Sequence, residues 1–176
     1  MWLSRKHRAI FLIGFMGAGK TTVGKILARK IGVGFVDLDE VIERECGISI
    51  SEIFARFGED YFRDLETKSL GSVDADKVMV IATGGGVVLR EENWSIMRQR
   101  GITVYLRASP EVLYMRVRDS CFRPLLNVKN PKERLFELLS QRASLYERAD
   151  LIIDTDSISP YEVAEKIIQR LSLSRG

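Results

Sequence analysis

The sequence predicts an α/β fold in which a five-stranded parallel sheet lies between layers of helices. Five short apolar runs have the character of strands: 9–13, 34–36, 78–82, 103–106 and 151–153. Segments with the spacing of amphipathic helices separate these runs. Because parallel strands need a crossover connection, the alternation of strand and helix favours a parallel sheet that is covered on both faces.

Local signals mark two helix starts and one long loop. Ser49 and Ser159 each stand three residues before a glutamate, which is the capping-box pattern, and Pro160 occupies the first helical position in the second case. The segment 119–131 contains two prolines between helical stretches. A loop of this length in a small domain is often functional, so we expect 119–131 to be a lid.

Length and composition suit one domain that spans residues 1–176, because 176 residues that are 45% hydrophobic can bury one substantial core. The 27 Lys and Arg residues against 24 Asp and Glu give a formal net charge of +3. This charge is too small to indicate a nucleic-acid partner. No segment approaches the roughly 20 apolar residues of a membrane span. We expect a monomer with no nucleic-acid or membrane partner.

The two cysteines, Cys46 and Cys121, have neither a metal-ligand spacing nor a CxxC spacing, which argues against a zinc site and a disulfide framework. The N-terminal residues lack the apolar core of a signal peptide. Because free thiols suit a reducing compartment, we expect a cytoplasmic protein.

The strongest functional signal follows the first apolar run. Residues 14–21, GFMGAGKT, match GxxxxGK[ST] in full and precede a helical run over 22–31. The glycines let backbone N–H groups close around phosphate oxygens, Lys20 can reach the β- and γ-phosphates, and the Thr21 hydroxyl can ligate magnesium. A glycine-rich turn that only joined strand to helix would not require Lys20 and Thr21. The motif therefore predicts nucleotide binding.

Several classes of nucleotide-binding protein compete at this point. A regulatory GTPase needs DxxG and NKxD motifs, and the sequence contains neither. A motor ATPase normally carries an acidic residue at the end of a later strand, whereas the run 78–82 is followed by Thr83 and three glycines at 84–86. A small-molecule kinase fits better. A nucleotide-dependent switch protein that uses no small acceptor is the alternative from another class.

Asp37 and Asp39 supply the carboxylates expected near magnesium and near an acceptor. Both follow the second apolar run, and the carboxyl ends of parallel strands share one rim with the phosphate loop. One carboxylate can face the metal while the other faces an incoming hydroxyl. Asp39 could instead cap a helix over 40–45, but its position beside the phosphate loop favours the functional role.

Six ordered motifs resemble those of the shikimate kinases: the phosphate loop 14–21, DLD at 37–39, GEDYFR at 58–63, TGGG at 83–86, RPLL at 123–126 and RASLY at 142–146. The likeness spans about residues 9–170. It implies a three-layer P-loop kinase fold with a five-stranded parallel sheet and a lid loop. It also implies an enzyme that uses ATP and Mg²⁺ to phosphorylate the 3-hydroxyl of shikimate, giving 3-phosphoshikimate and ADP in aromatic amino-acid (chorismate) biosynthesis.

The resemblance also implies a role for each matching residue. It assigns nucleotide binding to Gly17, Ala18, Gly19, Lys20, Thr21, Thr22, Arg123 and Pro160, and catalysis to Lys20, Asp39 and Arg123. It assigns magnesium to Thr21 and Asp37, and the acceptor to Asp39, Arg63, Gly85, Gly86 and Arg142. Two guanidinium groups suit the bidentate binding of a carboxylate. Contact with adenine falls to Arg116 or Arg118, which the motifs do not distinguish.

These side chains also have simpler interpretations. Arg63 and Arg142 have acidic neighbours at helical spacing and could form solvated ion pairs on a helix face, and Arg123 could be a surface residue. The aromatic residues at 54, 57, 61 and 62 have the spacing of a buried helix face, so we expect core residues rather than a binding platform. The main alternative enzyme is another small-molecule kinase of this architecture, such as a gluconate kinase.

Overall fold

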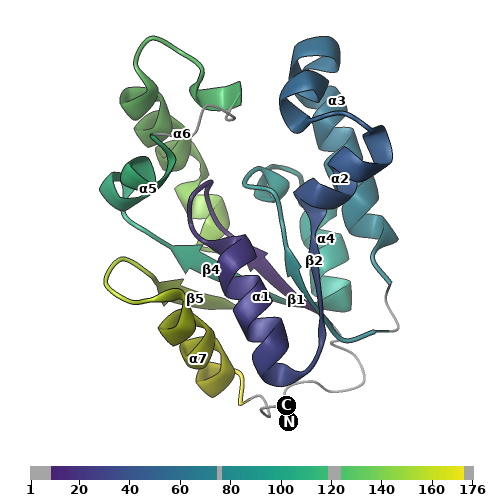
Figure 1. Ribbon diagram of the computed structural model, residues 1–176, viewed down its shortest axis with the longest axis vertical. Helices are drawn as coiled ribbons and strands as arrows, with labels where there is room; N and C mark the ends of the chain where they lie inside the picture. The colour runs from purple at the N-terminus through teal and green to yellow at the C-terminus, as the bar shows by residue number, and fades with distance from the viewer. Residues whose placement is uncertain (1–8, 75–76, 119–123, 173–176) are drawn as a thin grey trace.

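The sheet has five strands in the order β2-β3-β1-β4-β5 within the residues that the computed structural model describes, 9–74, 77–118 and 124–172. The strands are β1 (Ala9–Ile13), β2 (Gly34–Asp37), β3 (Met79–Ala82), β4 (Gly101–Arg107) and β5 (Leu151–Asp154). Every neighbouring pair is parallel. The α/β fold with a five-stranded parallel sheet is therefore confirmed (Figure 1).

Strand β1 lies at the centre of the sheet and is buried along its whole length, with no residue more than 7% exposed. Burial on both faces explains why the inner strands β3, β1 and β4 have apolar runs instead of an alternating pattern, whereas the edge strands β2 and β5 are only partly buried. The strands also extend past the apolar runs, because β2 ends at Asp37 and β4 ends at Arg107. Ladder hydrogen bonds use the backbone, so an apolar pattern does not reveal the polar end of a strand.

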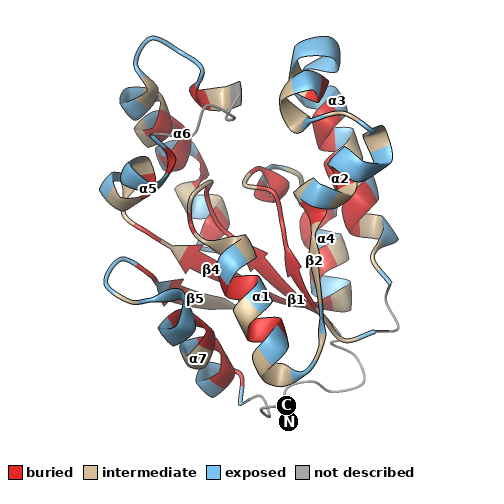
Figure 2. Ribbon diagram, in the orientation of Figure 1, coloured by how far each residue is buried: buried red, intermediate tan, exposed pale blue. Residues whose placement is uncertain are grey.

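Helices cover both faces of the sheet. Helices α1 (Lys20–Ile31) and α7 (Pro160–Arg170) pack together on one face, and α4 (Glu91–Arg100) packs on β4 from the other (Figure 1). The remaining helical elements are α2 (Leu38–Cys46), α3 (Ile50–Ser72), α5 (Pro110–Val117), α6 (Pro131–Tyr146) and the 3₁₀ turns η1 (Val87–Leu89) and η2 (Pro124–Leu126). Figure 2 shows buried residues concentrated on the strands and on the helix sides that face them.

Helix boundaries follow the predicted caps. Both capping boxes are present, at Ser49 for α3 and at Ser159 for α7. Helix α3 is interrupted at Gly58, whose φ of 84° is left-handed, so the helix consists of two parts that meet at a kink. None of the helices within the described residues combines the length and the apolar character that crossing a bilayer requires.

Candidate active site

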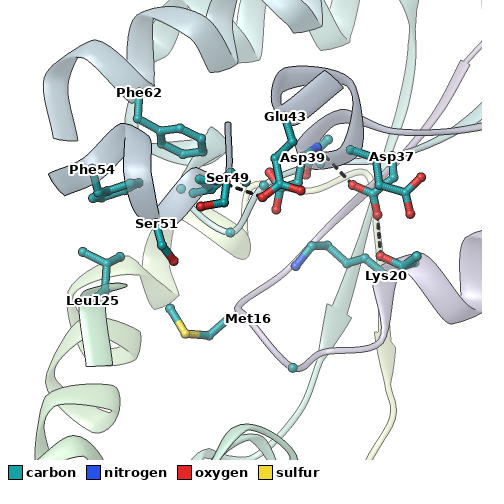
Figure 3. A pocket seen from close by; sticks show the side chains of 18 of the residues that line it. Met16, Lys20, Asp37, Asp39, Glu43, Ser49, Ser51, Phe54, Phe62 and Leu125 are labelled. Atoms are coloured by element: carbon teal, nitrogen blue, oxygen red, sulfur yellow. Dashed lines mark hydrogen bonds between the residues drawn. The ribbon is translucent and has the colours of Figure 1, made fainter. Parts of the chain in front are cut away.

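A cavity of about 540 Å³ opens over the carboxyl edge of the sheet. Its walls come from the phosphate loop, the residues that follow β2 and β3, helices α3 and α6, and the turn η2 (Figure 3). Parallel strands direct their carboxyl ends to one edge, so residues that are far apart in the sequence meet there. The predicted site residues that line the cavity are Gly17, Gly19, Lys20, Thr21, Thr22, Asp37, Asp39, Arg63, Gly85, Gly86 and Arg142.

The phosphate loop adopts a backbone that glycine accommodates most readily. Gly14, Gly17 and Gly19 have positive φ angles of 150°, 80° and 92°. Gly19 is the N-cap of α1, so the first N–H groups of the helix point into the loop. The Lys20 ammonium donates to the carbonyls of Gly14 at 2.7 Å and Phe15 at 3.0 Å. A helix N-terminus and a lysine charge thus share one small loop, which is an arrangement that binds phosphate.

Asp37 joins the phosphate loop to helix α2 through both oxygens of its carboxylate. Oδ1 accepts the backbone N–H of Asp39 at 3.0 Å and so caps α2, while Oδ2 accepts the Thr21 hydroxyl at 2.5 Å. The capping role that was considered for Asp39 therefore belongs to Asp37. A hydroxyl and a carboxylate side by side at the phosphate loop offer the oxygen ligands that Mg²⁺ prefers, so this pair fits a magnesium site.

Asp39 lies in the first turn of α2 and faces the loop that follows β3. A Cβ added at Gly84 would lie 3.2 Å from Asp39 Oδ1. Figure 3 shows the side chains of Asp37, Asp39 and Lys20 on the same side of the cavity. The two aspartates therefore have different neighbours although they are only two residues apart: Asp37 contacts Thr21, and Asp39 lies against the glycine loop.

Two buried arginines face the same cavity from different helices. Arg63 of α3 is 6% exposed, and Arg142 of α6 is 5% exposed. Arg63 pairs with Glu66 at 2.8 Å and with Glu59 at 2.9 Å. Burial disfavours the charged guanidinium, but the charges and hydrogen bonds of the two glutamates outweigh burial and raise the pKa of Arg63. The interpretation of these arginines as solvated surface ion pairs is wrong, because both are buried.

Glu66 is a part of the site that the motifs did not reveal. It is fully buried one helical turn after Arg63, and its Oε2 accepts from Arg63 Nη1. Its Oε1 has no hydrogen-bond partner among the described residues, and a Cβ at Gly84 would collide with it. Burial raises the pKa of the Glu66 carboxyl, while the charges of Arg63, Arg142 and Arg90 oppose that rise. The spacing from Arg63 was visible in the sequence, but the burial was not.

The aromatic residues of α3 divide between the cavity and the surface. Phe54 and Phe62 line the cavity with rings 4.9 Å apart, and Figure 3 shows them with Leu125 at the end away from Lys20. Phe57 and Tyr61 are 54% and 44% exposed, so the prediction that they belong to the core is wrong.

The kink in α3 explains this error. Because the left-handed residue Gly58 lies between the two halves of the helix, a spacing of three and four residues does not place all four rings on one face. The contribution of Phe54, Phe62 and Leu125 to the cavity was missed because their sequence spacing does not differ from that of core residues.

Two predicted nucleotide-binding residues that the structure describes, Ala18 and Pro160, are not among the residues that line the cavity. Arg123 lies outside the described residues. Pro160 is the exposed first residue of α7, and Ala18 is buried at 2% exposure. Of the two arginines considered for adenine, Arg116 donates to the carbonyl of Gly17 at 3.2 Å, which places its side chain beside the phosphate loop.

The cavity contains the phosphate loop and two buried arginines. It can therefore take the phosphates of a nucleotide on one side and an anionic acceptor on the other. This fold and this cavity define a P-loop small-molecule kinase. A family model described as "Shikimate kinase" matches residues 16–172. The chain belongs to the shikimate kinase family.

Individual relatives agree with the family match. The chain is 54% identical to the shikimate kinase of Thermodesulfovibrio yellowstonii over 95% of this chain and 97% of that protein. Among solved structures, the shikimate kinase from Acinetobacter baumannii in complex with shikimate superposes with a TM-score of 0.91 and 41% identity, covering 94% of this chain and 93% of the other. The shikimate kinase from Aquifex aeolicus gives a TM-score of 0.79 and 39% identity, covering 93% and 96%.

The burial of Glu66 predicts a pH-dependent contribution to stability. Because the pKa of Glu66 is raised in the folded state, the stability that the group contributes below its unfolded pKa is lost as the pH rises through the folded pKa. Glu66→Gln does not titrate. The free energy of unfolding of the unsubstituted protein relative to Glu66→Gln should therefore fall as the pH rises above the ordinary glutamate pKa of 4.5, by about 1.4 kcal/mol for each tenfold change in proton affinity.

Urea unfolding of both proteins across this pH range measures the difference. The opposite result, a gain in stability over the variant as the pH rises, would show that the charges of Arg63, Arg142 and Arg90 outweigh burial and lower the pKa of Glu66.

Proposed function

We propose that this chain transfers the γ-phosphoryl group of ATP to the 3-hydroxyl of shikimate, giving 3-phosphoshikimate and ADP. The observation that carries the proposal is the presence of two buried arginines, Arg63 and Arg142, in the same cavity as the phosphate loop. A pair of guanidinium groups selects a carboxylate-bearing acceptor. The related Acinetobacter baumannii enzyme was crystallised in complex with shikimate, which supports the same acceptor here.

On the acceptor side, the planar guanidinium groups bind the substrate carboxylate. Glu66 and Glu59 hold Arg63 from its own helix, so the orientation of the guanidinium does not depend on the ligand. A Cβ at Gly86 would collide with that guanidinium, which explains the need for glycine there. Gly85 and Gly86 let backbone amides approach the acceptor closely.

On the donor side, the phosphates of ATP lie in the loop, and Lys20 moves from the loop carbonyls to the β- and γ-phosphates. Thr21 and Asp37 would hold Mg²⁺, which would neutralise phosphate charge. The Arg116 guanidinium beside Gly17 is the arginine that we assign to the nucleotide.

Asp39 orients the acceptor hydroxyl and accepts its proton as the oxygen attacks the γ-phosphorus in line with the departing ADP oxygen. The reaction needs no covalent enzyme intermediate, because phosphoryl transfer is promoted mainly by positioning and by neutralising charge. The cavity walls formed by Phe54, Phe62 and Leu125 reduce the access of water, which would compete with the acceptor.

Other parts of the proposal rest on the sequence alone. This group comprises the roles of Arg123 and of a lid over 119–131, the contact of Pro160 with adenine, the monomeric state and the cytoplasmic location.

A coupled ADP-release assay tests the proposed function. The purified protein is supplied with MgATP and, in separate reactions, with shikimate, gluconate, a nucleoside monophosphate or no acceptor. We expect fast ADP release with shikimate alone. Fast release with gluconate instead would favour the alternative kinase, and equal release in all four reactions would favour a nucleotide switch protein.

Replacing either buried arginine should weaken acceptor binding far more than ATP binding. Loss of one partner of a buried charge-assisted contact typically costs about 2 to 5 kcal/mol, so Arg63→Ala or Arg142→Ala should raise the KM for shikimate by about 30-fold or more. Arg134→Ala is the matched control, because Arg134 lies on α6 like Arg142, but its side chain is 37% exposed and pairs with Glu137. A loss of ATP affinity with unchanged shikimate KM would contradict the assignment.

Substitutions at Asp37 and Asp39 should have different effects on magnesium dependence and turnover. Asp37→Asn should raise the magnesium concentration needed for half-maximal turnover, because a neutral amide replaces a carboxylate beside Thr21. Asp39→Asn should leave MgATP binding nearly intact. It should slow phosphoryl transfer by about 10²- to 10⁴-fold, which is the rate acceleration that a positioned general base usually contributes. Magnesium titrations of turnover in both variants distinguish these effects. Full activity in Asp39→Asn would remove Asp39 from catalysis.

A further inference from the structure

The glycine loop 84–86 is held by side chains from two helices. A run of three glycines has little conformational preference of its own, so its geometry must be imposed from outside. From α4, the side-chain amide of Asn93 and the indole of Trp94 donate to the carbonyls of the two residues after the run, at 2.9 and 3.0 Å. From α6, the Tyr146 hydroxyl donates to the carbonyl of Gly85 at 2.5 Å.

Tyr146 also lies one helical turn after Arg142 on the buried face of α6, so its hydroxyl is close to that positive charge. It is the last residue of α6 and fully buried, and its ring stacks on Tyr105 with centroids 5.1 Å apart. Burial raises the pKa of the Tyr146 hydroxyl, while the charge of Arg142 and a hydrogen bond to it oppose that rise. The hydroxyl therefore keeps its proton at neutral pH and can donate to Gly85 while it interacts with Arg142.

The geometry of the peptide bond extends the effect to Gly86. In a trans peptide the C=O of Gly85 and the N–H of Gly86 point in opposite directions. Holding the carbonyl therefore fixes the direction of the N–H. Gly86 is the residue whose Cβ would collide with the Arg63 guanidinium, so this peptide lies beside one arginine, while Tyr146 shares the buried face of α6 with the other.

Gly85 also lies against the phosphate loop, since a Cβ there would be 3.3 Å from the backbone nitrogen of Met16. One hydroxyl thus contacts a peptide that borders both halves of the cavity.

We propose that the Tyr146 hydroxyl is a positioning group for the acceptor carboxylate, which holds Arg142 and the peptide between Gly85 and Gly86 in one fixed arrangement. The proposal rests on the proposed function, because it assumes an acceptor that these groups bind. The alternative is that Tyr146 only packs in the core, and that its hydrogen bond to Gly85 has no effect on acceptor binding. The stacked ring of Tyr105 supplies the comparison, because Tyr105 is also a buried tyrosine, whereas the hydrogen bond to the Gly85 carbonyl comes from Tyr146.

The first test compares the kinetics of Tyr146→Phe and Tyr105→Phe, each of which retains the ring and removes the hydroxyl. Tyr146→Phe should raise the KM for shikimate about five- to fifteenfold, the usual effect of losing one hydrogen bond. Its kcat and its KM for ATP should stay within about twofold, and Tyr105→Phe should change none of the three by more than that. An unchanged shikimate KM in Tyr146→Phe would overturn the proposal. Equal changes in both variants that tracked their melting temperatures would also overturn it, because they indicate packing.

The second test does not depend on the acceptor. Amide hydrogen exchange at Val87, whose N–H closes the glycine loop by donating to the Gly84 carbonyl at 3.2 Å, should be faster in Tyr146→Phe than in the unsubstituted protein and unchanged in Tyr105→Phe, measured without ligands. Unchanged exchange in Tyr146→Phe would show that the hydroxyl does not hold the peptide. Failure of the unsubstituted enzyme to phosphorylate shikimate would reject the proposed function instead, and the exchange measurement would still decide whether Tyr146 fixes the loop.

Discussion

Two hydrogen bonds to a single carbonyl bring the halves of the site together. Leu12, near the end of the central strand β1, accepts both the backbone N–H of Thr83 at 3.1 Å and its hydroxyl at 2.9 Å. The phosphate loop begins directly after β1, and the glycine loop begins directly after Thr83. These bonds therefore set the distance between the two loops. Because Leu12 and Thr83 are buried, water cannot compete for this carbonyl.

The charges of the cavity follow from the same arrangement. Two guanidinium groups are buried at the rim, and a buried charge is stable only with partners that replace water. Glu66 supplies a carboxylate from within the protein, and Glu59 supplies a second, partly exposed one to Arg63. The Arg63 guanidinium is therefore held in place before an anionic ligand binds, which reduces the reorganisation that binding requires.

Helix α6 links the acceptor side to the rest of the molecule. Its buried face carries Arg142 and Tyr146, four residues apart and thus on the same side of the helix. The Arg142 guanidinium lies over the ring of Phe15, 5.9 Å from its centroid, and Tyr146 reaches the glycine loop. One rigid helix therefore contacts both loops of the site. The segment 119–131, predicted as a lid, leads into its first turn.

The sequence by itself determined the parts that depend on near neighbours: five strands, the capping boxes at Ser49 and Ser159, the phosphate loop and the family motifs. Tertiary structure decided the order of the strands, the burial of Arg63, Arg142 and Glu66, and the exposure of Phe57 and Tyr61. A cap or a loop is stabilised by residues a few positions away, so a short pattern suffices to predict it. Burial depends on elements that are distant in sequence, and a charged helix face has the same pattern whether water or another helix covers it.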